Sequence, residues 1–173
     1  PKTSGIKDYI GLFAVTSGIN VELYEKIFEK DEDDYNGIMI KAITDRLAEA
    51  FAEYMHDRVR KDLWGYQPKE LSTEDMIQEK YQGIRPAPGY PACPEHTVKK
   101  DIFTILQTDE IGMQLTDSMA MHPASSVSGF YFAHPDAKYF SVDKIDEDQL
   151  EDMASRRSVP TKQLRKWLGP NLR

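Results

Sequence analysis

The sequence has few of the residues that build disulfides, metal sites or membrane spans. Its 173 residues include one cysteine, Cys93, which excludes an internal disulfide and fits a reducing cytoplasm. The four histidines and Cys93 lack the paired spacing of a structural zinc site, so we expect no metal in this chain. No apolar run approaches the roughly 20 residues of a membrane helix, and we expect no membrane contact.

Motifs of phosphate and nucleophile chemistry are also missing. There is no glycine-rich phosphate loop and no dinucleotide fingerprint. The serines at 125, 126 and 128 have no nearby base and no nucleophile-elbow context, so we predict no catalytic residue. The formal net charge of −7 argues against broad nucleic-acid binding, which depends on neutralising phosphates.

The hydrophobic pattern predicts an α+β fold, with an antiparallel sheet and long flanking helices in a single domain over residues 1–173. A long helix is expected over residues 35–64 and a shorter one over 21–29, the latter with Leu23, Ile27 and Phe28 inward. The long helix has an apolar stripe that we expect to face the core: Ile38, Ala42, Leu47, Ala50, Phe51, Tyr54, Met55, Val59 and Leu63.

The remaining elements are read from turn residues and alternation. Further helices are expected after Ser72 and over residues 96–107, 146–157 and 160–168. Strands are expected over residues 8–16, around 113–115, and over 125–133 and 138–143. The last two strands are predicted to form a hairpin, because His134-Pro135-Asp136 has turn chemistry.

Residues 82–96 are predicted to form a stiff, extended loop. Four of the ten prolines lie there, at 86, 88, 91 and 94, a density that no helix or central strand tolerates. Arg85 offers a planar donor set for a carboxylate, Gly89 permits close approach, and Tyr90 adds an aromatic face. The loop therefore fits a small zwitterionic ligand. The alternative is a rigid loop in which Arg85 makes an internal ion pair.

Other polar and aromatic candidates lie outside the loop. Asp45 and Glu49 share a helix face, where they either receive cations or partners or form a solvated surface. His96 is either a capping or surface histidine or a contact to a cofactor. Tyr139 and Phe140 are adjacent in the expected strand, so one can pack inward while the other faces a groove.

The run Arg85-Pro86-Ala87-Pro88-Gly89-Tyr90 resembles the S-adenosylmethionine motif, Arg-x-x-x-Gly-Tyr, of the activation domain of cobalamin-dependent methionine synthases. Similar segments follow the family's order along nearly the whole chain. They are residues 33–36, 45–53, 64–66, 83–96, 126–129, 134–136, 138–139 and 167–172.

The resemblance implies a module that reactivates the enzyme by reductive remethylation. The family transfers a methyl group from methyltetrahydrofolate to homocysteine through cobalamin. When the cofactor is oxidised to cob(II)alamin, the activation domain presents the methyl group of S-adenosylmethionine, and flavodoxin or a similar reductase supplies an electron. The implied partners are that reductase and the cobalamin-binding domain, which holds most of the cobalamin. Zinc is implied only for the full-length enzyme, and the location is cytoplasmic.

Site residues are implied by position in the motifs. The S-adenosylmethionine contacts would be Glu49, Arg85, Ala87, Gly89, Tyr90, Tyr139 and Phe140. The contacts to cobalamin or its domain would be Asp45, Tyr90 and His96. The family's domain begins earlier and includes an upstream acidic ligand contact, so we expect a fragment with weakened affinity and no turnover of its own.

Rival readings stay open. A free-standing methyltransferase is disfavoured, because its usual fold opens with a glycine-rich turn that is absent here. Two helices around Arg156-Arg157-Ser158 superficially resemble a helix-turn-helix, against which the acidic balance weighs. The last alternative is a non-catalytic interaction domain without a ligand.

Overall fold

The computed structural model describes residues 4–173, so the expected domain start at Pro1 lies outside the described part. Two antiparallel strands form its centre: β1 (Gly11–Thr16) pairs with β4 (Ser126–Tyr131). A second, shorter antiparallel pair consists of β2 (Gln114–Leu115) and β3 (Met121–His122). The predicted α+β class with an antiparallel sheet is confirmed. β1, β2 and β4 fall within the expected ranges, whereas β3 was not predicted.

The predicted hairpin between residues 125–133 and 138–143 is wrong. One edge of β4 carries β1, and its other edge carries the proline-rich loop. The backbone N–H of Phe130 donates to the carbonyl of Pro86 at 2.9 Å, and Ile84 and Phe132 exchange backbone hydrogen bonds of 3.0 Å. No edge of β4 remains for residues 138–143, which run as an extended, non-strand segment.

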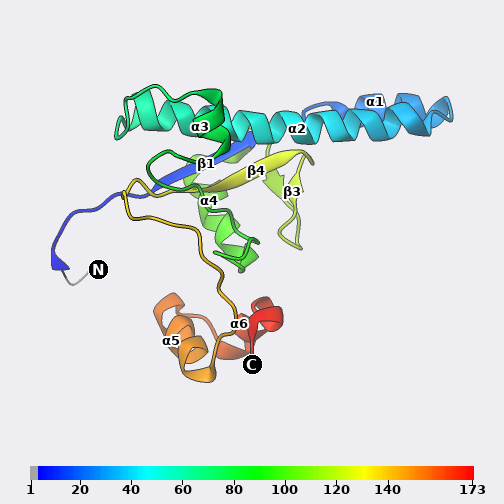
Figure 1. Cartoon of the computed structure of the whole chain (residues 1–173). Coiled ribbons are helices and arrows are strands. Elements are labelled where there is room, and N and C mark those ends of the chain that lie inside the picture. Colours follow the sequence, from blue (N-terminus) through cyan, green and yellow to red (C-terminus); the bar gives the residue numbers. More distant parts are fainter. Residues whose placement is uncertain (1–3) are drawn as a thin grey trace.

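Helix α2 (Asp34–Arg58) lies across one face of the sheet, with α1 (Val21–Lys30) beside its N-terminal part (Figure 1). It begins where the Asp33 side chain accepts a hydrogen bond from the backbone N–H of Asn36 at 3.0 Å. A π-helical turn, Val59–Leu63, continues it, and Gly65 ends it with a left-handed φ of 71°. Both expected helices are therefore confirmed.

The face of α2 that packs on the sheet is the opposite of the predicted one. Its buried residues within the α-helix are small or polar: Thr44, Ala48, Ala52 and His56. Most large side chains of the predicted stripe are exposed instead, namely Ile38, Leu47, Phe51, Tyr54 and Leu63; of the rest, only Val59 is buried and Met55 partly so. Small side chains let the helix approach the sheet closely.

The predicted inward orientation of α1 is also mostly wrong. Leu23 and Ile27 are exposed, and only Phe28 is partly buried. Periodicity identifies an apolar face but does not say what covers it. Together with α2, this helix presents a broad apolar surface that nothing in the described chain covers, a feature typical of interaction surfaces.

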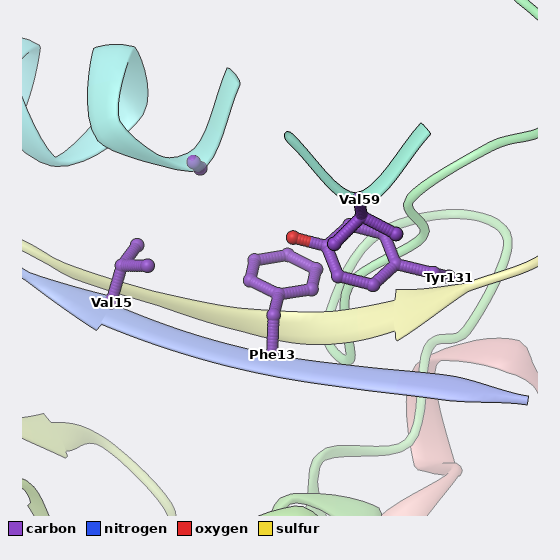
Figure 2. Close-up of a cluster of buried hydrophobic side chains, with 5 residues drawn as sticks. Phe13, Val15, Val59 and Tyr131 are labelled. Atoms are coloured by element: carbon purple, nitrogen blue, oxygen red, sulfur yellow. The ribbon is translucent and has the colours of Figure 1, made fainter. Parts of the chain in front are cut away.

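Alternation along β1 divides the interior between two layers. Phe13 and Val15 point from the sheet toward α2, where they meet Val59 and Tyr131 (Figure 2). Leu12 and Ala14 pack on the opposite side, against a cluster made by Ile102, Phe103 and Met113. Helix α4 (Lys99–Leu106) supplies the first two of these, so the sheet lies between α2 and α4.

The C-terminal helices form a small unit with its own core. α5 (Glu147–Arg157) and α6 (Thr161–Trp167) confirm the expected closing helices and lie apart from the sheet, at the end of an extended segment (Figure 1). Their core consists of Leu150, Ala154, Leu164 and Leu168. An ion pair from Arg157 to the buried Glu95 joins this unit to the proline-rich loop.

The remaining helices are short. α3 (Thr73–Ile77) begins at the expected cap, where Ser72 Oγ accepts from the backbone N–H of Asp75 at 3.1 Å. A 3-10 turn, His96–Val98, leads into α4, as expected for residues 96–107. Over residues 4–173, no helix has both the length and the apolar character required to cross a bilayer.

Because the small residues of α2 are buried and its large apolar residues are exposed, two substitutions on this helix should differ in their effect on stability. Ala48→Leu places a large side chain where Ala48 is 2% exposed, and we expect a loss of about 1–3 kcal/mol in the free energy of unfolding from overpacking. Leu47→Ala, at a side chain 54% exposed, should change it by less than about 0.5 kcal/mol. Urea unfolding of both variants measures this. A large loss with Leu47→Ala and none with Ala48→Leu would restore the original prediction.

Candidate functional site

The proline-rich loop is held in place by backbone contacts of its first part with β4 and by an internal turn farther along. Its first part lies on β4 through the bonds of Ile84 and Pro86 described above. Farther along, the N–H of Gly89 donates to the carbonyl of Cys93 at 2.7 Å, and the N–H of Cys93 donates to the carbonyl of Tyr90 at 2.9 Å. Gly89 has φ of 99°, and a Cβ there would collide with the His96 ring. Glycine is therefore required at this turn.

A cavity of about 370 Å³ lies between this loop, α2 and the segment that follows β4. Six of the sequence-predicted ligand residues line it: Glu49, Arg85, Ala87, Tyr90, Tyr139 and Phe140. An adjoining hollow of about 190 Å³ shares Glu49, Ala87 and Tyr90 with it. The predicted residues Gly89 and His96 line that second hollow, so residues far apart in sequence meet around one loop.

Arg85 lines the cavity and also makes an internal ion pair. Its Nη2 lies 2.6 Å from Glu53 Oε2, and its Nη1 lies 3.2 Å from His56 Nδ1 and donates to the Tyr81 hydroxyl at 3.0 Å. The side chain is 19% exposed. These contacts account for three of the five guanidinium N–H groups. The alternative of an internal ion pair is thus what the structure shows, while donors remain on the residue that borders the cavity.

His56 is buried beneath Arg85 and is held neutral. Burial, reinforced by the positive charges of Arg60 and Arg85, lowers the pKa of His56 to about 3. An arginine cannot accept a hydrogen bond, so Nδ1 must be the acceptor from Arg85. The ring proton therefore lies on Nε2, which is 3.2 Å from the Tyr66 hydroxyl.

Tyr139 joins the extended segment after β4 to the loop. Its hydroxyl accepts a hydrogen bond from the backbone N–H of Arg85 at 3.0 Å. Burial raises the pKa of Tyr139, so the hydroxyl stays protonated and also has a proton to donate. The contact sets the distance between Arg85 and Tyr139, and therefore the width of the cavity between them.

The outward-facing candidates are accessible. Tyr90 is 61% exposed and Phe140 is 65% exposed. His96 is also exposed, and its Nδ1 lies 3.2 Å from Lys99 Nζ. Asp45 borders neither hollow of the loop. Its Oδ1 accepts a hydrogen bond from Ser125 Oγ at 2.6 Å. Asp45 lies one helical turn before Glu49, on the same side of α2.

Several residues at the site were not predicted. Glu53, Tyr81 and Lys99 are charged or polar partners of Arg85 or His96, and Phe13 and Val127 form part of the cavity wall. No sequence signal identifies His56, because a position off the predicted apolar stripe is also typical of a solvent-exposed residue. The other unpredicted residues reach the site through contacts between segments distant in the sequence, which residue spacing does not reveal.

Comparison with known proteins identifies the class to which this fold and site belong. The sequence model of the family described as "Vitamin B12 dependent methionine synthase, activation domain" matches residues 1–158. The chain belongs to this family.

A solved structure agrees with this assignment. The chain is similar to the MetH reactivation domain in a crystal structure bound to AdoHcy, with 57% sequence identity and a TM-score of 0.95. The match covers 99% of this chain and 54% of that one, so this chain spans about half the length of the relative. The resemblance inferred from the sequence motifs is confirmed.

The neutral His56 predicts a pH dependence of stability. Its folded pKa of about 3 lies below the ordinary 6.5, so its contribution is complete above about pH 6.5 and is lost as the pH falls toward 3. The free energy of unfolding should fall there by up to about 1.4 kcal/mol per pH unit. Urea unfolding at pH 7 and 5 should show a smaller fall for His56→Gln than for the unsubstituted chain. An equal fall in the free energy of unfolding between pH 7 and 5 for the two proteins would mean that His56 does not remain neutral when folded.

Proposed function

We propose that this chain binds S-adenosylmethionine in the cavity at Arg85 and presents its methyl group to cob(II)alamin during the reductive remethylation of a methionine synthase. One observation carries the proposal. A carboxylate, Glu49, and a guanidinium, Arg85, border the same cavity as the aromatic side chains of Tyr90, Tyr139 and Phe140. This set matches a ligand that combines an amino acid, a sulfonium and an adenine ring. The AdoHcy in the related MetH structure is what S-adenosylmethionine becomes when it loses that methyl group.

Each proposed contact uses a different part of the ligand. Arg85 would bind the ligand carboxylate through its remaining N–H donors, and Glu49 would lie near the amino group. The backbone at Ala87 and Gly89 would meet the adenine edge. Tyr90, Tyr139 and Phe140 supply aromatic faces, against which a sulfonium or an adenine packs favourably.

The chain's chemical contribution is orientation. Cobalamin, bound mainly by a neighbouring domain and reduced by an electron from flavodoxin or a similar reductase, would supply the nucleophile. The cavity residues would fix the orientation of the ligand and so align its methyl group for transfer. No general base is needed, because the methyl group leaves sulfur without a proton transfer and the bonding pair stays on sulfur.

The face presented to cobalamin would contain Tyr90 and His96. Both are exposed, and both border the smaller hollow beside the loop, so they fit a flat ligand brought from outside. Asp45, on the same helix edge as Glu49, would contact the cobalamin-binding domain. These assignments agree with an interface on one side of the molecule.

In the whole enzyme this module would support methyl transfer from methyltetrahydrofolate to homocysteine in the cytoplasm. We propose that residues 1–173 are a fragment of the activation domain, without turnover of its own, and that zinc is needed only elsewhere in the full-length protein. The alternative is an interaction domain that binds no ligand. The coincidence of opposite charges in one cavity favours the ligand-binding function.

Arg85→Lys should weaken S-adenosylmethionine binding by about tenfold or more, because lysine keeps the charge but loses the planar donor pair. Titration calorimetry on the full-length protein measures the affinity. Arg156→Lys, at an exposed arginine of α5, is the matched control. Absence of heat with the unsubstituted protein would favour the interaction-domain alternative, and equal affinity of both variants would exclude the carboxylate contact.

Glu53→Gln should strengthen binding. The Glu53 carboxylate lies 2.6 Å from Arg85 Nη2, so its negative charge would repel the carboxylate of the ligand. Removing that negative charge should lower the dissociation constant by about threefold to tenfold, which is the size of one typical net hydrogen bond in water. The same calorimetric titration tests this, with Glu70→Gln at an exposed glutamate as control. Weaker binding in Glu53→Gln would show that Glu53 helps to position Arg85 and does not repel the ligand.

A further inference from the structure

Lys99 occupies an unfavourable place for a positive charge. It is 6% exposed and is the first residue of α4, where the helix dipole is also positive. Over residues 4–173 no carboxylate forms an ion pair with it. Burial lowers the pKa of Lys99, which reflects this cost. A buried ammonium without an acidic partner is rare, and packing alone would be served better by methionine.

The ammonium is used for two hydrogen bonds. Lys99 Nζ donates to the carbonyl of Met119 at 3.0 Å and lies 3.2 Å from Nδ1 of His96. An ammonium has donors and no acceptor, so Nδ1 of His96 must accept. A neutral imidazole has one proton, which must then lie on Nε2.

The rest of the His96 ring is fixed by its surroundings. Its Cε1 edge lies against the backbone of Gly89, where a Cβ would not fit. Nε2 has no hydrogen-bond partner among the described residues, and the side chain is exposed. Nδ1 is thus held by Lys99, the Cε1 edge lies against Gly89, and Nε2 is left without a hydrogen-bond partner in the described part of the chain.

We propose that Lys99 is a positioning residue that holds His96 in the tautomer with its proton on Nε2, so that the ring offers an N–H donor to an acceptor on the cobalamin-bearing domain. The inference rests on the proposed function for the identity of that partner. A carbonyl-rich surface, such as the amide side chains around a corrin, is the chemistry that such a donor recognises.

The charges near His96 favour the same neutral state. Burial, and then the charge of Lys99, lower the pKa of His96 below its ordinary value. The other ionisable groups around the ring border the hollows beside it: Glu49 and Tyr90 in one, and Lys100, Asp117 and Lys166 in the other. None of these is a hydrogen-bond partner of His96 in the described chain.

Nitrogen-15 NMR of histidine-labelled protein tests the tautomer directly, on this chain. At neutral pH the unsubstituted chain should show His96 with an unprotonated, acceptor-type Nδ1 and a protonated Nε2, without averaging between the two. In Lys99→Met the two nitrogen signals should move toward each other, and the pKa of His96 should rise toward its ordinary value. Lys100→Met, at the exposed neighbouring lysine, should leave both unchanged. A protonated Nδ1 or averaged signals in the unsubstituted chain would overturn the proposal even if Lys99→Met fails to fold.

A second measurement tests the consequence in the full-length enzyme. Lys99→Met should slow reductive remethylation by about threefold to tenfold, as expected for one interfacial hydrogen bond, with unchanged affinity for S-adenosylmethionine. An unchanged rate would overturn the positioning role while leaving the proposed function intact. Failure of the unsubstituted enzyme to bind S-adenosylmethionine would refute the proposed function instead, and the NMR result would still decide the state of His96.

Discussion

The pairing of the proline-rich loop with the free edge of β4 is the constraint on which the site depends. Prolines cannot donate to a ladder, so the contact is limited to the carbonyl of Pro86 and the paired bonds of Ile84. These few bonds are enough, because the loop is already stiff and loses little conformational freedom when it docks. They place Arg85 and Tyr90 at the mouth of a cavity whose floor is the sheet and whose wall is α2.

The small-residue face of α2 serves the same arrangement. Ala48 and Ala52 let the helix lie close to Phe13 and Val15, and Ala52 itself borders the cavity. Glu49 stands next to this face, so the packing that buries the alanines also directs a carboxylate to the cavity rim. The larger apolar side chains of the helix, such as Leu47, Phe51 and Tyr54, point away from the sheet and are exposed.

A largely buried polar cluster joins α2 to the proline-rich loop beside the cavity. His56 and Glu53 lie one turn apart on α2, and both contact the guanidinium of Arg85. The neutral ring and the carboxylate fix the position of the Arg85 side chain at the cavity wall. The same contacts occupy part of the Arg85 guanidinium, and its other N–H groups remain on the side chain that borders the cavity. The Tyr139 hydroxyl accepts a hydrogen bond from the backbone N–H of Arg85 and so extends this network to the wall of the cavity opposite α2.

Local sequence determined the helix positions, the stiff loop and the family. Caps at Asp33 and Ser72, the density of prolines and the ordered motifs are short-range signals, and each is decided by neighbouring residues. Only the tertiary structure decided which face of α2 is buried, which strand β4 pairs with and what Arg85 contacts. Each of these depends on a partner distant in sequence, and a hydrophobic period or a polar residue does not specify its partner. Only the folded chain determines which side chains contact the guanidinium of Arg85 and which segment pairs with the second edge of β4.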